Sequence, residues 1–288
     1  MKISKILVPI NGRFKNDNLL NTSFALSRHL DCHVDVVHYE NDPKEAIPML
    51  GEGMSGALIQ DMLNDTKEEY KKYRTNARQL YETVRTKFGT NDLEKNESNF
   101  SSSWLETEGN EDYLLSYHSR FNDLIILEKP NADTQFQASM LINVALFETA
   151  RPVLLCPNHS VKTMFETITV CWNDSIEAVR ALQASIPFLE RAERVVLLHS
   201  SLTEGETSNE LSDLQGYLKH HGISAQMRPI VCKSSETIGE SLLRVSEDVE
   251  ADLMVMGGYS HSRMREFILG GVTKDVLEKM EIPVLMMH

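Results

Sequence analysis

Short apolar runs alternate with longer segments of helical periodicity along the whole chain. The apolar runs have the length of a strand and are continuous, which is typical of parallel strands covered on both faces. Examples are ILVPI (6–10), LIIL (124–127), ITVCW (168–172) and LMVM (253–256). Helical patterns between such runs predict β-α crossover units and a parallel sheet.

The order of these elements occurs twice. KILVPIN and TITVCWN start 162 residues apart (5 and 167), and DLIIL and DLMVM start 129 apart (123 and 252). RPVLLCP (151–157) likewise matches IPVLMMH (282–288). We therefore expect an α/β fold of two tandem, doubly wound domains, residues 1–158 and 165–288. Each is a five-stranded parallel sheet in the order β-α-β-α-β-α-β-α-β.

The first half is longer because it holds an insertion. GEGMSG (51–56) is followed by a charged segment, residues 58–88, whose apolar residues recur at helical spacing. They are Ile59, Met62, Tyr70, Tyr73, Ala77, Leu80, Val84 and Phe88. This pattern predicts one long amphipathic helix.

Composition and charge narrow the function. The 288 residues carry a formal net charge of −13, which argues against a broad nucleic-acid surface. No apolar run is long enough to span a bilayer, and the N-terminus lacks a signal-peptide pattern, so we expect a cytoplasmic protein. The four cysteines make no CxxC pair, so disulfides and a structural metal are not expected. None of the standard hydrolase or P-loop motifs occurs, and we predict no catalytic residues.

Candidate binding residues follow the strands of the second half. Open parallel sheets bind ligands beyond the carboxyl ends of their strands. These ends carry Asn173-Asp174, His199-Ser200, Arg228–Val231 and Gly257-Gly258.

The segment GGYSHSRMREFILGGVT (257–273) has a glycine pair at each end. A glycine can take a positive φ and lets a ligand approach the main chain. A helix that starts at Gly271 would point the N–H groups of residues 271–273 at an anion, and Arg263 would add positive charge. The other interpretation is a tight turn and a close packing point around a short helix.

The same segment resembles the phosphate-binding loop of the universal stress protein family, G-x-x-G, nine residues, then G-S or G-T. Gly257 holds the first place and Gly270 the third. VCWNDSIEAVRA (170–181) and the closing strands resemble the two-domain bacterial members. The resemblance implies the adenine nucleotide alpha hydrolase-like fold and an ATP site. The candidate nucleotide-binding residues are Cys171, Asn173, Ser200, Met256, Gly257, Tyr259, Ser260, Arg263, Gly270, Gly271, Val272 and Thr273.

This chain departs from the family pattern in both halves. Ser260 stands in the place of the second glycine, Gly271 replaces the Ser or Thr, and Asn173 stands where an Asp is usual. In the first half, residues 127–146 contain no glycine, and Glu128 follows the strand. The first half is therefore expected to be a degenerate copy.

Two functions stay open at this point. One is a universal stress protein that binds ATP or another adenine nucleotide, with or without Mg²⁺, in its C-terminal domain, in a stress-response or signalling role. It would be a weak ATPase at most, its two domains would pack on each other, and a homodimer is compatible with the sequence. The alternative is a scaffold that binds no nucleotide and acts through protein–protein contacts, for instance of the long helix.

Overall fold

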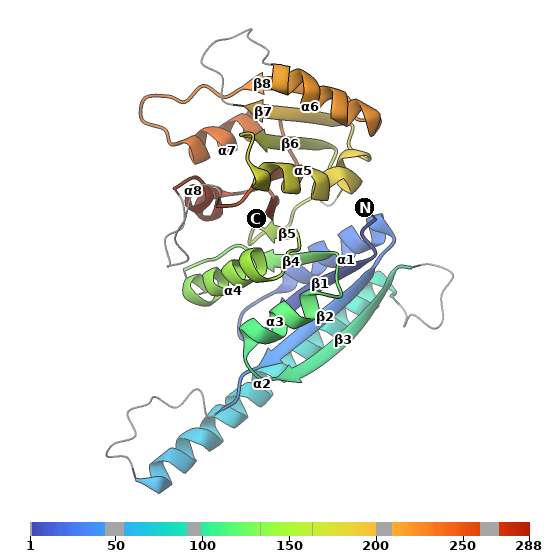
Figure 1. Ribbon diagram of the computed structural model, residues 1–288. Helices are drawn as coiled ribbons and strands as arrows, with labels where there is room; N and C mark the ends of the chain where they lie inside the picture. The colour runs from blue at the N-terminus through green and yellow to red at the C-terminus, as the bar shows by residue number, and fades with distance from the viewer. Residues whose placement is uncertain are drawn as a thin grey trace. The chain divides into compact units, whose positions relative to one another are not determined.

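A computed structural model describes residues 2–43, 55–90, 99–132, 134–162, 164–199, 209–259 and 271–288 (Figure 1). Strands and helices alternate from one end to the other, as the apolar pattern predicts. In chain order the elements are β1 (Lys5–Ile10), α1 (Asp17–Leu30), β2 (His33–Glu40), α2 (Gly56–Phe88), β3 (Ser101–Glu108), α3 (Glu111–Ser119), β4 (Leu124–Glu128), α4 (Gln135–Glu148), β5 (Val153–Cys156), β6 (Thr167–Trp172), α5 (Ile176–Leu189), β7 (Arg194–His199), α6 (Asn209–His220), β8 (Ala225–Pro229), α7 (Ile238–Asp248), β9 (Leu253–Gly257), α8 (Gly271–Lys279) and β10 (Val284–Met287).

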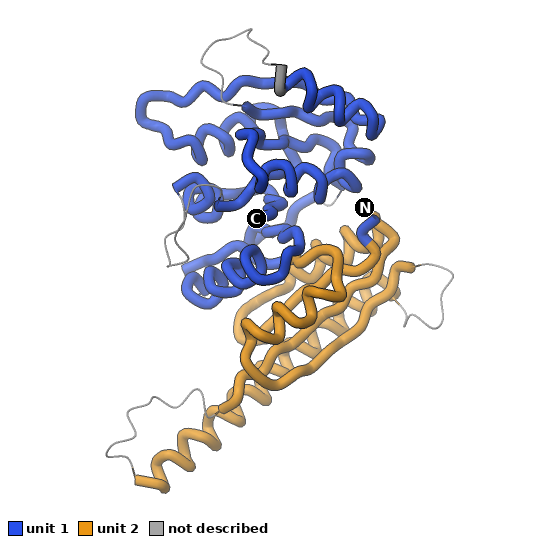
Figure 2. The backbone as a smooth tube through the Cα atoms, in the orientation of Figure 1, with its two compact units in different colours: residues 1–3, 127–288 blue, residues 4–126 orange. Residues whose placement is uncertain are grey.

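The chain forms two compact units, residues 4–126 and residues 1–3 with 127–288 (Figure 2). The α4 and β5 segments, which belong to the first half of the sequence, lie in the unit of residues 127–288. The compact units thus differ from the predicted domains, residues 1–158 and 165–288, and that division stays a prediction.

The unit of residues 4–126 contains a parallel sheet in the order β3-β2-β1-β4. Lys5 of β1 is level with His33 of β2, and Ile6 is level with Leu124 of β4. The apolar runs form the buried core, as continuous hydrophobic strands should. Ile6, Leu7, Leu124 and Ile125 are all fully buried.

Helix α2 is the long helix that the insertion predicts, and it has 33 residues. The Ser55 side chain accepts a hydrogen bond from the Leu58 N–H at its start, and Gly89 ends it at a φ of 65°. Its buried side chains, Ala77, Tyr81 and Val84, all lie in the C-terminal half, where α2 contacts α1 and strands β2 and β3. Burial of side chains therefore contributes little to the stability of the N-terminal half of α2.

The unit of residues 127–288 has the strand order β5-β10-β9-β6-β7-β8. All of its pairings are parallel except that of β10 with β5, where Val284 is level with Leu155. The strand order reverses at β6, which has β7 on one side and β9 on the other. The α/β fold with a mostly parallel, doubly wound sheet is thereby confirmed, and the reversal fixes where a ligand would bind.

Candidate functional site

The carboxyl ends of β6 and β9 lie side by side at the reversal of the strand order. Val170 is level with Val255 in this pair, so β6 ends at Trp172 close to where β9 ends at Gly257. Helix α5 follows β6, and α8 follows β9. This is the part of the sheet that the sequence selected.

Asn173 builds a tight turn after β6. Its side-chain oxygen accepts hydrogen bonds from the Ser175 hydroxyl at 2.7 Å and the Ser175 N–H at 3.4 Å. Asp174, between them, takes a φ of 56°, and Ser175 then caps α5 by accepting from the Ala178 N–H at 3.1 Å. Residues 173 and 174 are exposed. The turn therefore presents its surface at the strand end while its amide oxygen holds the entry to α5.

Gly257 is required by packing, not by its backbone angle. It is not among the described glycines with positive φ, contrary to the expectation that it supplies the turn. A methyl group on Gly257 would lie 2.7 Å from the Ala178 nitrogen and 2.7 Å from the Glu177 carbonyl carbon. A methyl group on Gly258 would find its nearest atom only at 3.8 Å. The first turn of α5 thus lies directly against the end of β9, a close approach that the sequence predicted at the other glycine pair, Gly270-Gly271.

Tyr259 makes the turn instead, at a φ of 62°. Its ring is buried with its centroid 4.9 Å from that of Phe147, and its hydroxyl donates to Asn143 Oδ1 at 3.2 Å. Burial raises the pKa of Tyr259 to about 12. The side chain of this predicted site residue therefore anchors the loop onto α4, and only its main chain faces the strand end.

Thr273 ties the two ends of the loop together. Its hydroxyl oxygen accepts a hydrogen bond from the Tyr259 N–H at 3.3 Å, across 14 residues of chain, and Thr273 is 4% exposed. Among the described residues, helix α8 covers Gly271–Lys279. Gly271 is exposed, and within the part of the chain that the structure describes a methyl group there would meet no atom within 4 Å. The first turn of α8 is thereby held beside the end of β9.

The remaining predicted site residues divide into two groups. Met256 is buried in β9, and Cys171 is half-buried in β6. Ser200, Ser260, Arg263 and Gly270 lie outside the described residues. Sequence reasoning missed the anchor of the loop, formed by Asn143 and Phe147 together with His288, whose ring nitrogen pairs with the Gly258 carbonyl at 3.0 Å. No local signal could have found it, because Asn143 is 116 residues from Tyr259.

The first half builds the same turn but covers it. The side-chain oxygen of Asn11 accepts from the Arg13 N–H at 3.0 Å, and Gly12 has a φ of 67°. A methyl group on Gly12 would overlap the Tyr73 carbonyl oxygen and lie 2.9 Å from the Ala77 side chain. The backbone of α2 therefore lies on the end of β1.

A polar cluster occupies the opposite, amino-terminal edge of the same unit. His33 bridges the Ser101 hydroxyl at 2.8 Å and the Asp35 carboxylate at 3.0 Å. The order resembles a nucleophile relay, but Ser101 is fully buried and Asp35 is also paired with Lys5 at 2.6 Å. We interpret the cluster as structural. Within the described ranges, no group of three or more His, Cys, Asp or Glu side chains is arranged to hold a metal.

Comparison with known proteins shows which family the C-terminal half resembles and which fold the chain shares. Residues 164–288 match the universal stress protein family. A universal stress protein of Synechocystis sp. is 26% identical over 172 residues, 57% of this chain and 57% of that protein. One of Methanocaldococcus jannaschii is 28% identical over 87 residues, 28% of this chain and 53% of that protein. The chain thus spans little more than half the length of the curated relatives it matches.

The solved structures extend the similarity to almost the whole chain. The crystal structure of a universal stress protein from Archaeoglobus fulgidus aligns with a TM-score of 0.68, covering 98% of this chain and 95% of that one at 14% identity. An identity this low shows a shared fold. The family match itself covers residues 164–288, so the C-terminal half of the chain is similar to the universal stress protein family, and the fold is shared over almost the whole chain.

Proposed function

We propose that the C-terminal half binds one adenine nucleotide, with ATP as the first candidate, at the carboxyl ends of β6 and β9. The observation that carries the proposal is the hydrogen bond from the Tyr259 N–H to the Thr273 hydroxyl. It holds Thr273, in the first described turn of α8, at the reversal of the strand order, where open α/β sheets bind ligands. The loop joined at this point is the one whose sequence resembles the family's phosphate loop.

The chemistry of the described ends suits a phosphate. The first N–H groups of a helix lack partners within the helix, and together with the helix dipole they favour an anion. With the helix start that the sequence predicts, these groups in α8 belong to Gly271, Val272 and Thr273. The glycine at 271 suits this approach, because no atom of the described residues lies within 4 Å of where its side chain would start. Asn173, exposed on the neighbouring strand end, would face the adenosine part.

We assign one nucleotide to each chain, because the equivalent place in the first half is occupied. There, α2 lies against Gly12, and β4 ends in Glu128 where β9 ends in Gly257. A carboxylate at the strand end would repel phosphate. The expected stoichiometry is therefore one, with or without Mg²⁺.

Equilibrium binding of ATP with Mg²⁺ to the full chain tests the proposal. Wild type should bind one nucleotide, and Gly270→Val should bind far more weakly. Gly216→Val, on the exposed face of α6 with nothing within 4 Å, is the matched control and should bind as wild type does. No binding by wild type at millimolar ATP would exclude the nucleotide function. Equal binding by wild type and Gly270→Val would exclude this location.

The second candidate is a scaffold that acts through protein contacts and binds no nucleotide. Two observations favour it. Ser260 and Gly271 depart from the family's loop pattern, and the N-terminal half of α2 has none of that helix's buried side chains. Failure of wild type to bind ATP while partner contacts through α2 persist would select this function.

In either case we propose a stress-response or signalling role in the cytoplasm. In the described part of the chain, no helix is both long enough and apolar enough to cross a membrane. ATP hydrolysis, if any, should be slow, because no paired nucleophile and base line the described site. Phosphate release by wild type measures this directly, and multiple turnovers per second would contradict it.

A further inference from the structure

The apolar seam of α2 continues beyond the part of the helix that packs on the sheet. Residues at strict three- and four-residue spacing run along it, which is the heptad pattern of helices that pair with other helices. They are Ile59, Leu63, Thr66, Tyr70, Tyr73, Ala77, Leu80 and Val84. Ala77 and Val84 fill the core of the unit of residues 4–126. The seam residues in the N-terminal part of α2 lie outside this core and indicate a second partner.

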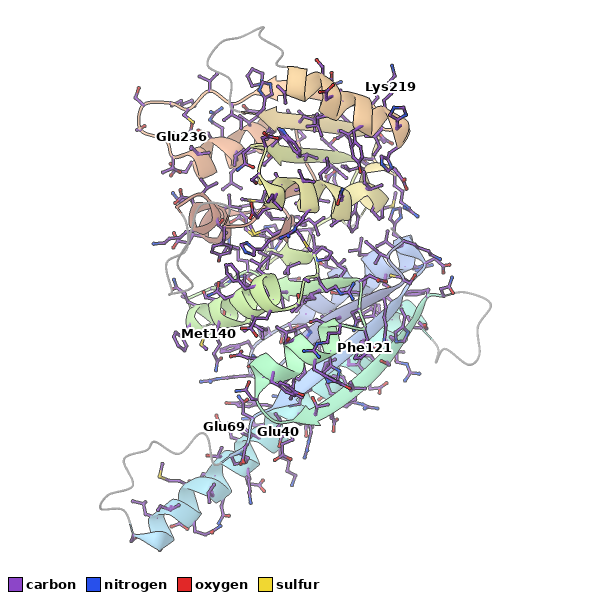
Figure 3. The ribbon with its side chains drawn as sticks, in the orientation of Figure 1. Glu40, Glu69, Phe121, Met140, Lys219 and Glu236 are labelled. Atoms are coloured by element: carbon purple, nitrogen blue, oxygen red, sulfur yellow. The ribbon has the colours of Figure 1, made fainter. Side chains whose placement is uncertain are left out.

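The protruding part of α2, residues 56–72, is about 25 Å long at 1.5 Å per residue. The contact of Tyr73 with Gly12 and the ion pair of Arg74 with Glu40, at 3.6 Å, mark where the helix meets the strand ends. In Figure 3 the turns N-terminal to Glu69 extend beyond the strand end that carries Glu40. The seam side chains Ile59 and Leu63 remain partly exposed there, and Leu58 beside them is 47% exposed.

The charges along this part of α2 change sign once. Residues 61–69 carry Asp61, Asp65, Glu68 and Glu69 against a single Lys67. Residues 71–78 carry only positive charges, at positions 71, 72, 74 and 78. The helix dipole does not account for the pattern, because its influence is confined to the first and last turns and these residues lie further in. A helix with one acidic and one basic stretch is complementary to itself when reversed.

We propose that residues 62–74 of α2 pair antiparallel with the same segment of a second copy of this chain. An alignment centred near residue 68 puts Leu63 against Tyr73 of the second copy and Thr66 against its Tyr70. The acidic stretch of each helix then lies beside the basic stretch of the other, which favours this register over a parallel one. Because the two bodies lie at opposite ends of the paired segment, a two-fold symmetric dimer forms. This pairing does not depend on nucleotide binding.

The oligomeric state of the full chain tests the pairing. Analytical ultracentrifugation over a range of concentrations should show a reversible monomer–dimer equilibrium. Leu63→Glu should raise the dissociation constant by about tenfold or more, since a charge would enter the seam. Asn64→Glu, exposed on the next position of the same turn and off the seam, is the matched control and should leave the equilibrium unchanged.

Charge exchange tests the antiparallel arrangement. One variant carries Asp61→Lys and Asp65→Lys, and the other carries Lys71→Glu and Lys72→Glu. Each alone should dimerise more weakly than wild type, and an equimolar mixture should form heterodimers, detectable by native mass spectrometry.

Three outcomes would overturn the proposal: a wild-type monomer at every concentration, a dimer unaffected by Leu63→Glu, or no rescue in the mixture. A monomer whose melting temperature falls in Leu63→Glu would instead indicate that another segment of the same chain covers the seam.

Discussion

The turns that follow β1 and β6 have the same local structure but different surroundings. Both strands run into an asparagine whose side-chain oxygen turns the chain, Asn11 in one and Asn173 in the other. Both asparagines are followed by a residue with positive φ, Gly12 at 67° and Asp174 at 56°. At β1 the backbone of α2 lies on that residue, whereas Asp174 is exposed.

The difference shows how a strand end is covered without any change in the turn that follows it. The strand order and the turn are kept, and a longer helix from the insertion takes the place above the strand end. Only glycine fits beneath α2, because any side chain at position 12 would overlap the helix backbone. The turn at Asn173 is exposed, so a side chain fits at the equivalent position, where Asp174 stands.

Exchanging the residue types at positions 12 and 174 should have the largest effect on stability, and the two variants should differ strongly. Gly12→Asp forces a side chain into the backbone of α2 and should destabilise the unit of residues 4–126 by about 4 kcal/mol. Asp174→Gly should change stability by less than about 0.5 kcal/mol, because that turn is exposed. Hydrogen exchange of peptides from β1 and α2 measures the first change. Native protection of α2 in Gly12→Asp would show that the close approach is wrong.

A single methyl group added at the end of β9 should lower the stability of the unit of residues 127–288. Gly257→Ala brings a carbon to 2.7 Å from the Ala178 nitrogen, so the first turn of α5 must shift, at a cost of about 2 kcal/mol. Gly258→Ala, whose nearest neighbour is at 3.8 Å, is the adjacent control and should cost under about 0.5 kcal/mol. Urea unfolding followed in the unit of residues 127–288 compares the two. Similar losses in both variants would contradict the packing role of Gly257.

Acid should lower the stability of the two halves unequally, because their sheets differ at the amino-terminal edges. Burial alone would raise the pKa of Asp35, but its hydrogen bonds with His33 and Ser103 and its pairing with Lys5 hold it well below its usual range. The third residue of β7, Val196, is apolar where the third of β2 is Asp35. The carboxylate therefore stabilises only the unit of residues 4–126.

This stabilisation is complete above the unfolded-state pKa of about 3.9 and is lost as the pH falls below it. Asp35→Asn should cost about 2 kcal/mol at pH 7 and should flatten the acid sensitivity of that unit between about pH 4 and pH 2. Unfolding curves at several pH values measure both effects. An unchanged pH dependence in Asp35→Asn would show that other carboxylates govern it.

The sequence predicted the repeated order of elements and the long helix because both depend on local periodicity. Residues 58–88 were expected to be helical, and α2 covers Gly56–Phe88. The strand ends were also predicted correctly, since continuous apolar runs end where the chain turns. Long-range packing was not accessible in this way. The sequence around Gly12 does not indicate that Tyr73 lies against it. The sequence around Gly257 likewise does not indicate the contact with the first turn of α5.

Candidate site residues show the same division. Thr273 was selected for its backbone N–H, and the structure adds a role for its hydroxyl, which accepts from the Tyr259 N–H. Tyr259 was selected because of its place in the motif, but its ring packs against Phe147 of α4. A motif fixes the order of residues along the loop, whereas the direction of each side chain depends on elements more than a hundred residues away.

The tether between Tyr259 and Thr273 lies in the C-terminal half, and its loss should have the smallest effect. Thr273→Val leaves the buried Tyr259 N–H without its acceptor, at a cost of about 1 kcal/mol. If the first turn of α8 holds a phosphate, ATP affinity should fall about fivefold with it, since every 1.4 kcal/mol corresponds to a factor of ten. Thr273→Ser keeps the hydroxyl and should behave as wild type in calorimetric titration with ATP. A loss of affinity in Thr273→Ser equal to that in Thr273→Val would point to the methyl group, not the tether, as what positions α8.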